Sequence, residues 1–220
     1  MQANYEQRLR LTFSKGGPAR YIGHLDLARV LERSFNRVKL PIAYTQGFNP
    51  HPRMQMATAL PLGTISQHEY ADIWMRTAME PAAAQELIMS KMAPGIDVYR
   101  VEEVPIKGKS LQVCTVSSDY KVELLDAMDA GVINGRVSDL LAAESMIRVR
   151  ARGKKRKEYD LRPLINTLTF APDESEYGTL HMNLSLMPSK TGRPDEVLLA
   201  MDLDPLAARI YRLHIEMVER

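Results

Sequence analysis

The sequence predicts an α+β protein with two halves of similar size, each with the element order β-α-β-β-α-β. Short runs in which apolar and polar residues alternate are typical of half-buried strands, and between them apolar residues recur at helical spacing. Proline and glycine interrupt the chain where these elements should end. This order is that of a ferredoxin-like fold, so we expect two ferredoxin-like halves in tandem, at residues 1–106 and 112–220.

The first half begins with a strand and a helix. Residues 8–14 alternate between apolar and polar side chains, as in a strand with one buried face. Helical spacing of apolar residues predicts a helix at 25–39, which Pro41 ends because proline disfavours helical geometry in the residue before it. We expect two further strands, a helix with proline in its first turn and a closing strand, at residues 54–60, 68–75, 81–93 and 96–104.

The second half follows a linker at Lys107–Leu111 and repeats the order more loosely. We expect strands at residues 115–125, 146–152, 164–171, 179–187 and 210–218, and helices at residues 137–143 and 194–201. Four of the five residues from Gly153 to Lys157 are cationic. We therefore expect this segment to be an exposed, flexible basic loop.

The composition is that of an ordinary globular protein. Hydrophobic residues make up 45% of the 220 residues and charged residues 25%, which suits one large core or two modest ones. No apolar run approaches the roughly 20 residues of a membrane span, and residues 1–10 lack the apolar stretch of a signal peptide. The single cysteine, Cys114, excludes an internal disulfide and indicates a reducing compartment. We therefore expect a cytoplasmic protein without a membrane partner.

Motifs for cofactors and metals are missing. One cysteine cannot supply the roughly four thiolates of an iron–sulfur cluster. The sequence contains no phosphate-binding glycine loop, dinucleotide fingerprint or nucleophile elbow. His24 and His51 lack a nearby cysteine or carboxylate at metal-ligand spacing. We expect neither a metal nor a cofactor.

A formal net charge of +2 conceals two basic islands. Residues 1–53 contain nine Lys and Arg against three Asp and Glu, and residues 148–163 contain eight against two. The rest of the chain is acidic. Such segregation indicates an anionic partner that binds at a defined place.

The first island carries a row of arginines on the predicted helix. Arg29, Arg33 and Arg37 are four residues apart, so they share one helix face and repel one another by a few tenths of a kcal/mol per pair. A phosphate backbone would offset this repulsion, because arginine binds phosphate in a bidentate manner. Arg20 precedes the helix and belongs to the same island. The alternative is a solvated helix face.

Residues 44–53 form a loop rich in glycine, asparagine and proline that combines aromatic and cationic side chains. Tyr44 and Phe48 are candidate stacking platforms for bases, and His51 and Arg53 are candidate phosphate contacts. Proteins that recognise single-stranded RNA use this combination. The alternative is a structural loop whose aromatic side chains fill the core.

The second island is expected to place Arg148, Arg150 and Arg152 on one face of a strand, because they alternate with small or apolar residues. The cations that follow are further candidates for phosphate contacts: Lys154, Lys155, Arg156, Lys157 and Arg162. The alternative is a merely solvated loop.

His24 is the one candidate for acid–base chemistry. It could act as a general base if a scissile phosphate lay near it. Asp26 follows two residues later and suits either the N-cap or the first turn of the predicted helix. The alternative for both residues is a structural role at the start of that helix.

Several runs resemble the radical SAM-linked protein family: Phe13 to Lys15, Arg20 to Leu27, Leu40 and Pro41, Tyr44 to Arg53, Ala59 to Gly63 and Asp160 to Ile165. In that family the domain occurs fused to, or encoded beside, a radical SAM enzyme. The resemblance therefore implies such an enzyme as a partner. The chain lacks a Cys-x3-Cys-x2-Cys motif, so the radical chemistry would belong to the partner.

Together these observations favour a non-catalytic accessory protein that binds RNA or presents a substrate to a radical SAM enzyme. The enzyme's target would be RNA or a ribosome-associated molecule. One alternative is a metal-independent endoribonuclease with His24 as its base, by analogy with nucleases of tandem ferredoxin-like architecture. Another is a protein–protein adaptor whose basic islands meet an acidic surface.

Overall fold

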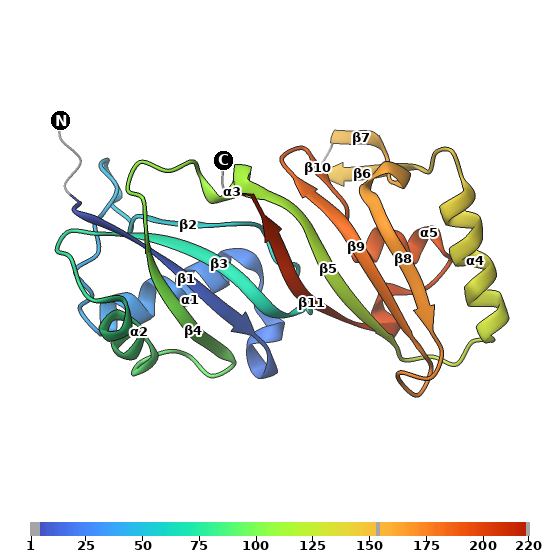
Figure 1. The fold of residues 1–220 in the computed structure, drawn as a ribbon, viewed down its shortest axis with the longest axis horizontal. Helices are drawn as coiled ribbons and strands as arrows, with labels where there is room; N and C mark the ends of the chain where they lie inside the picture. Colours follow the sequence, from blue (N-terminus) through green and yellow to red (C-terminus); the bar gives the residue numbers. More distant parts are fainter. Residues whose placement is uncertain (1–4, 153–154, 219–220) are drawn as a thin grey trace. The chain divides into compact units, whose positions relative to one another are not determined.

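The computed structural model of the chain describes residues 5–152 and 155–218, and side chains for all of these except residues 151, 152 and 155. They fall into two compact units. One contains the described residues before Val116 together with Val218, and the other runs from Val116 to Met217. Each unit has its own strands and helices (Figure 1). The expected α+β class is confirmed.

The first unit contains a four-stranded arrangement in the order β4-β1-β3-β2, in which all neighbouring strands are antiparallel. Its elements along the chain are β1 (Gln7–Lys15), α1 (His24–Arg37), β2 (Met54–Met56), β3 (Ile65–Met75), α2 (Pro81–Met89), β4 (Ile96–Val104) and the short helix α3 (Leu111–Cys114). The predicted linker, Lys107–Leu111, lies within this unit.

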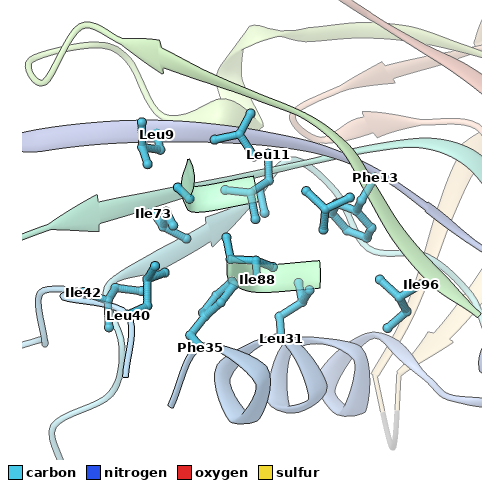
Figure 2. Packing of buried hydrophobic residues seen from close by; sticks show 14 of the residues in the cluster. Leu9, Leu11, Phe13, Leu31, Phe35, Leu40, Ile42, Ile73, Ile88 and Ile96 are labelled. Carbon is cyan, nitrogen blue, oxygen red and sulfur yellow. The ribbon is translucent and has the colours of Figure 1, made fainter. Parts of the chain in front are cut away.

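The core of the first unit explains why one face of α1 is free. Leu9, Leu11 and Phe13 alternate along β1 and are fully buried, and Leu31 and Phe35 of α1 pack against the same cluster (Figure 2). Each of these buried side chains stabilises the unit by about 1.5–3 kcal/mol. Because the apolar side of α1 is committed to this core, its polar side faces solvent.

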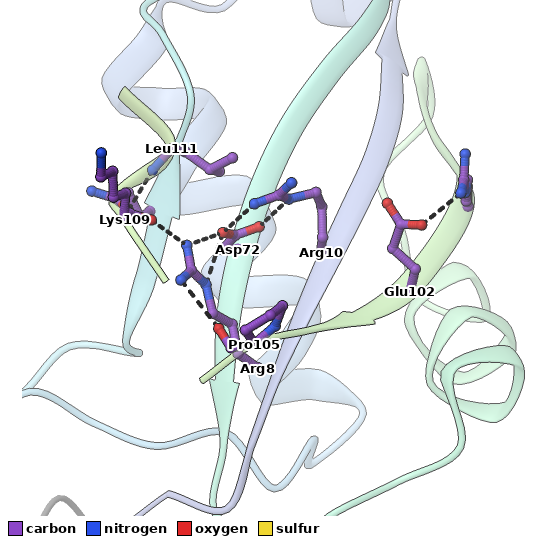
Figure 3. Close-up of polar contacts among 9 residues, drawn as sticks. Arg8, Arg10, Asp72, Glu102, Pro105, Lys109 and Leu111 are labelled. Carbon is purple, nitrogen blue, oxygen red and sulfur yellow. Dashed lines mark hydrogen bonds and ion pairs between the residues drawn. The ribbon is translucent and has the colours of Figure 1, made fainter. Parts of the chain in front are cut away.

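A buried ion cluster fastens the end of β4 and the segment after it to this unit. Asp72 on β3 is fully buried and accepts hydrogen bonds from Arg8 and Arg10 on β1, with Nε to carboxylate distances of 2.9 Å from each arginine (Figure 3). Arg8 also donates to the carbonyl oxygens of Pro105 at 3.5 Å and Lys109 at 3.1 Å. These contacts hold the predicted linker against the first unit.

The second unit arranges its main strands in the order β8-β9-β5-β11, with the short β10 also on β9. Its strands are β5 (Thr115–Leu124), β6 (Ile147–Arg152), β7 (Lys155–Asp160), β8 (Ile165–Ala171), β9 (Thr179–Met187), β10 (Lys190–Thr191) and β11 (Ala208–Met217). Its helices are α4 (Ala130–Ala142) and α5 (Pro194–Ala200). Both helices contribute to one core cluster with the inner faces of β5, β8 and β9.

Three predictions about local structure are wrong. Lys155–Lys157 do not belong to a flexible loop, because they begin β7, which pairs antiparallel with β6. The helix predicted at 137–143 begins at Ala130, where the side chain of Asp129 caps it by accepting from the Val132 N–H at 3.0 Å. The strand predicted at 54–60 ends at Met56.

No helix among residues 5–152 and 155–218 is both long enough and apolar enough to cross a membrane.

Candidate nucleic-acid interface

The arginine row of α1 is exposed as predicted. Arg29, Arg33 and Arg37 all face solvent, about 6 Å apart along the helix axis. Arg29 pairs with Asp26 at 3.1 Å, but more than half of each side chain is exposed, so this pair contributes little. Within the described part of the chain, no ion pair neutralises Arg33 or Arg37. The row is therefore a strip of positive charge.

The loop after α1 is anchored at its base and open at its tip. Ala43 and Arg53 are joined by a hydrogen bond from the Arg53 N–H to the Ala43 carbonyl at 2.7 Å, and Thr45 donates to the His51 carbonyl at 2.8 Å. His51 in turn donates its backbone N–H to the Thr45 hydroxyl at 3.0 Å. Gly47 lies in the loop between these hydrogen-bonded residues and adopts a φ of +150°, a conformation that residues other than glycine rarely adopt.

Phe48 lies at this tip and is completely exposed, with a relative accessibility of 106%. It does not fill the core, so the structural alternative for this residue is wrong. Tyr44 is 43% exposed, and its hydroxyl donates to Oδ1 of Asn36 on α1 at 2.7 Å. Asn36 directly precedes Arg37, so this bond places the loop beside the C-terminal end of the arginine row.

Arg53 is held by aromatic rings rather than pointing freely into solvent. Its guanidinium carbon lies 4.7 Å from the ring centre of Tyr5 and 5.1 Å from that of Trp74. Such cation–π contacts orient the group but leave its N–H donors available for an anion. Sequence reasoning missed Tyr5 and Trp74, because they lie on other segments and no local pattern connects them to Arg53.

Arg20 is also stacked on a neighbour. Its guanidinium lies 4.5 Å from the ring centre of Tyr21 and donates to the hydroxyl of the same residue. Tyr21, Leu25 and Leu62 are all more than 60% exposed, and the N–H of Gly63 donates to the Arg20 carbonyl at 2.9 Å. Arg20 therefore lies beside exposed apolar side chains.

His24 is the first residue of α1 and is half-buried. Gly23 is the N-cap and provides no side-chain hydrogen bond, so Asp26 is a first-turn acid and not the cap. Over residues 5–152 and 155–218, no group of three His, Cys, Asp or Glu residues is arranged to hold a metal ion.

The second island forms the β6–β7 hairpin. Arg148 and Arg150 occupy alternate positions of β6, so they share one face as predicted. Arg148 lies 3.5 Å from Glu196 on α5, and the Arg150 guanidinium lies 4.6 Å from the ring centre of Tyr159. Arg156 and Lys157 are exposed on opposite faces of β7. Lys154 lies outside the described residues, as do the side chains of Arg152 and Lys155.

Arg162 has a structural role in the fold. Its guanidinium donates to the carbonyl oxygen of Leu141 at 3.1 and 2.9 Å and to that of Ile165 at 3.2 Å. Leu141 lies in the last turn of α4, where carbonyl groups lack helical partners. Because these donors serve the backbone, we leave Arg162 out of the candidate interface.

Two solved structures to which the chain is similar have low sequence identity to it. A chain of the crystal structure of a Cbf5-Nop10-Gar1 complex has a TM-score of 0.49 and 8% identity over 93% of this chain and 48% of that one. A chain of the archaeal box H/ACA sRNP Nop10-Cbf5 complex has a TM-score of 0.40 and 6% identity over 92% of this chain and 46% of that one. The chain thus spans about half the length of these relatives.

None of the curated proteins with which the chain was compared matches it in sequence. A family model described as "Uncharacterized protein conserved in bacteria (DUF2344)" matches residues 8–194. This description names no partner enzyme, so the association with a radical SAM enzyme stays a prediction.

Proposed function

The chain belongs to the bacterially conserved family DUF2344, and we propose that it is a non-catalytic protein that binds single-stranded RNA through its first unit. The proposed interface comprises the arginine row of α1, the tip of the 44–53 loop and the stacked guanidinium of Arg53. The observation that carries the proposal is the fully exposed Phe48 at the tip of a loop that Tyr44 joins to α1.

Phe48 is unusual because a large apolar ring remains wholly in water at the tip of an anchored loop. Burying such a side chain is worth about 1.5–3 kcal/mol, and this gain is forgone in the free protein. A nucleic-acid base stacked on an aromatic ring contributes about 1–3 kcal/mol. The same loop contacts α1 through Tyr44 and Asn36, so a base on Phe48 would carry its phosphates towards Arg37.

The charges of this surface favour a phosphate backbone over other anions. Arg29, Arg33 and Arg37 form a line and not a cluster, which suits a ligand with regularly repeated negative charge. Their mutual repulsion is relieved when phosphates lie between them.

Binding of a short fluorescent single-stranded RNA, measured by anisotropy over a series of salt concentrations, tests the proposal. Phe48→Ala should weaken binding by about 1–3 kcal/mol. Leu206→Ala is the matched control, because Leu206 is 89% exposed and lies in the second unit. Equal effects of the two substitutions would contradict the proposal.

The salt dependence provides a second measurement. Arg33→Gln should lower the slope of log affinity against log salt concentration by about 0.7, the value for one lost contact with a single strand. Lys91→Gln removes an exposed cation that follows α2 and should leave the slope unchanged. A slope near zero for the wild-type protein would exclude the basic surface as the contact region.

We further propose that each unit is a ferredoxin-like half. In the first unit, the order β1-α1-β2-β3-α2-β4 with strands arranged β4-β1-β3-β2 supports this assignment. In the second, β5-α4-β8-β9-α5-β11 with strands arranged β11-β5-β9-β8 has the same pattern, and the β6–β7 hairpin is an insertion between α4 and β8.

The partnership with a radical SAM enzyme is a finer proposal that rests on the sequence motifs alone. If it holds, the RNA bound here is the substrate or a guide to the substrate of that enzyme. Affinity purification of the tagged protein from cells, with proteomics and sequencing of bound RNA, tests this. Recovery of RNA without a radical SAM enzyme would support RNA binding and contradict the partnership.

A further inference from the structure

The second unit contains a cavity of about 340 Å³ between the β6–β7 hairpin and the turn that joins β9 to β10. Its volume lies at the lower end of the range for small-molecule sites, roughly 300–1,000 Å³. Three cations line it, Arg150, Lys157 and Lys190, and Asp160 is its one acidic lining residue. All of the lining side chains are described and all belong to this unit.

Asp160 supplies one negative charge among these cations, and its carboxylate is held by the backbone. Its Oδ1 accepts hydrogen bonds from the N–H of Met146 at 2.8 Å and the N–H of Arg162 at 3.0 Å. These bonds close the base of the hairpin. With three cations against one carboxylate, the described side chains that line the cavity carry an excess of positive charge.

The guanidinium of Arg150 has two buried donor atoms. Its Nε and Nη2 atoms are excluded from solvent and have no hydrogen-bond partner among the described residues. The ring of Tyr159 beneath the guanidinium keeps the group oriented. Buried donors on a charged group are costly to leave unpaired, so the Arg150 guanidinium adds to the electrostatic strain at this side of the cavity.

The other two cations are brought to the cavity by the backbone. Arg150 and Lys157 are direct partners in the β6–β7 register, an arrangement that destabilises a hairpin when both side chains are cationic. Lys190 follows Ser189, whose φ of +65° is uncommon for a residue other than glycine. The Ser185 hydroxyl donates to the Lys190 carbonyl at 2.7 Å and holds this turn. An anion in the cavity would relieve the repulsion.

We propose that this cavity binds the phosphomonoester group of a nucleotide, either at a phosphorylated RNA end or in a free nucleotide. A phosphomonoester carries about −1.5 to −2 charges at neutral pH, which matches the excess charge of the cavity better than the single charge of an internal phosphodiester. The apolar wall formed by Pro163, Leu164 and Met187 would receive the base. The RNA-end form of this inference rests on the proposed RNA-binding function.

Calorimetric titration of the full-length protein with adenosine monophosphate and with adenosine tests the cavity directly. The monophosphate should bind saturably, and adenosine should bind at least about tenfold more weakly, as expected for the loss of charge-assisted hydrogen bonds. Lys157→Gln and Lys190→Gln should each weaken the monophosphate by about tenfold. Arg156→Gln is the matched control, because Arg156 is the neighbouring cation on the opposite face of β7.

Two RNAs of the same sequence, one with a 5′-phosphate and one with a 5′-hydroxyl, distinguish the sources of the ligand. Tighter binding of the phosphorylated RNA, lost in Lys190→Gln, supports an RNA end. Equal binding of both RNAs with retained monophosphate binding supports a free nucleotide. The proposal is overturned if the monophosphate does not bind and the two RNAs are equal, or if both lysine variants bind like wild type. Binding of the hydroxyl RNA measures the proposed function separately.

Discussion

Replacement of Asp72 by asparagine should destabilise the first unit strongly. Asp72 is fully buried and accepts hydrogen bonds from two arginines, of which Arg8 is only 2% exposed and Arg10 is 17% exposed in its side chain. Without the carboxylate charge, two guanidinium groups remain in a mostly dry environment. Breaking a buried pair in this way costs about 3–5 kcal/mol, a large share of the roughly 5–15 kcal/mol that stabilises a typical domain.

The single tryptophan provides a selective assay for this loss. Trp74 is 9% exposed, lies on β3, and its ring centre is 4.9 Å from the Arg8 guanidinium carbon. Its fluorescence therefore reports the unfolding of the first unit during urea titration. The midpoint should fall for Asp72→Asn while the slope of the transition stays unchanged.

A surface pair in the same unit serves as the control. Glu102 accepts a hydrogen bond from Arg100 at 2.6 Å, but their side chains are 35% and 66% exposed. Glu102→Gln should cost no more than about 1 kcal/mol. A loss below about 1 kcal/mol for Asp72→Asn would refute the reasoning, and so would equal losses for the two variants.

Three further predictions follow from other parts of the structure. His24→Ala should leave RNA affinity unchanged, and neither this variant nor the wild type should cleave RNA. Metal-free RNA cleavage by wild type that this variant abolishes would instead establish the endoribonuclease alternative. Arg162→Met should lower the free energy of unfolding by about 1–3 kcal/mol, because the Leu141 and Ile165 carbonyls in the second unit lose their donor. Thermal unfolding followed by circular dichroism measures this loss. A weakened RNA affinity in the folded variant would return Arg162 to the interface. Burial raises the pKa of Glu123, but hydrogen bonds from Lys121 and Tyr211 outweigh it and hold that pKa below its usual value. The contribution of Glu123 to the free energy of unfolding should therefore be fully present above the pKa of Glu in the unfolded chain, and it should be lost as the pH falls through the folded pKa. Unfolding of Glu123→Gln, measured over a series of acidic pH values, should lack this part of the pH dependence.

The arginine row shows what a local pattern can predict about a site. Arg29, Arg33 and Arg37 share a face because the helix repeat is a property of the backbone, and that face is exposed because Leu27, Leu31 and Phe35 bury the other one. A local pattern likewise predicted a strand at Ile96–Val104, and β4 has these bounds in the structure.

The β6–β7 hairpin shows where such patterns fail. The charge of Lys155–Lys157 indicated exposure but carried no information on backbone conformation, and pairing with β6 made this segment a strand. The cavity beside the hairpin also depends on Lys190, which belongs to a later turn. No local periodicity connects the two segments.

From the sequence by itself, the α+β class, the basic islands and the exposed face of α1 were determined, because each depends on the spacing of neighbouring residues. Only the tertiary structure decided which cations remain available to a ligand. Arg162 is taken by backbone carbonyls, whereas the two rings that hold Arg53 leave its N–H donors available, and two buried N–H donors of Arg150 have no partner among the described residues. These differences arise because the partners of a guanidinium are brought to it by chain folding over long sequence separations, and its own sequence neighbours do not encode them.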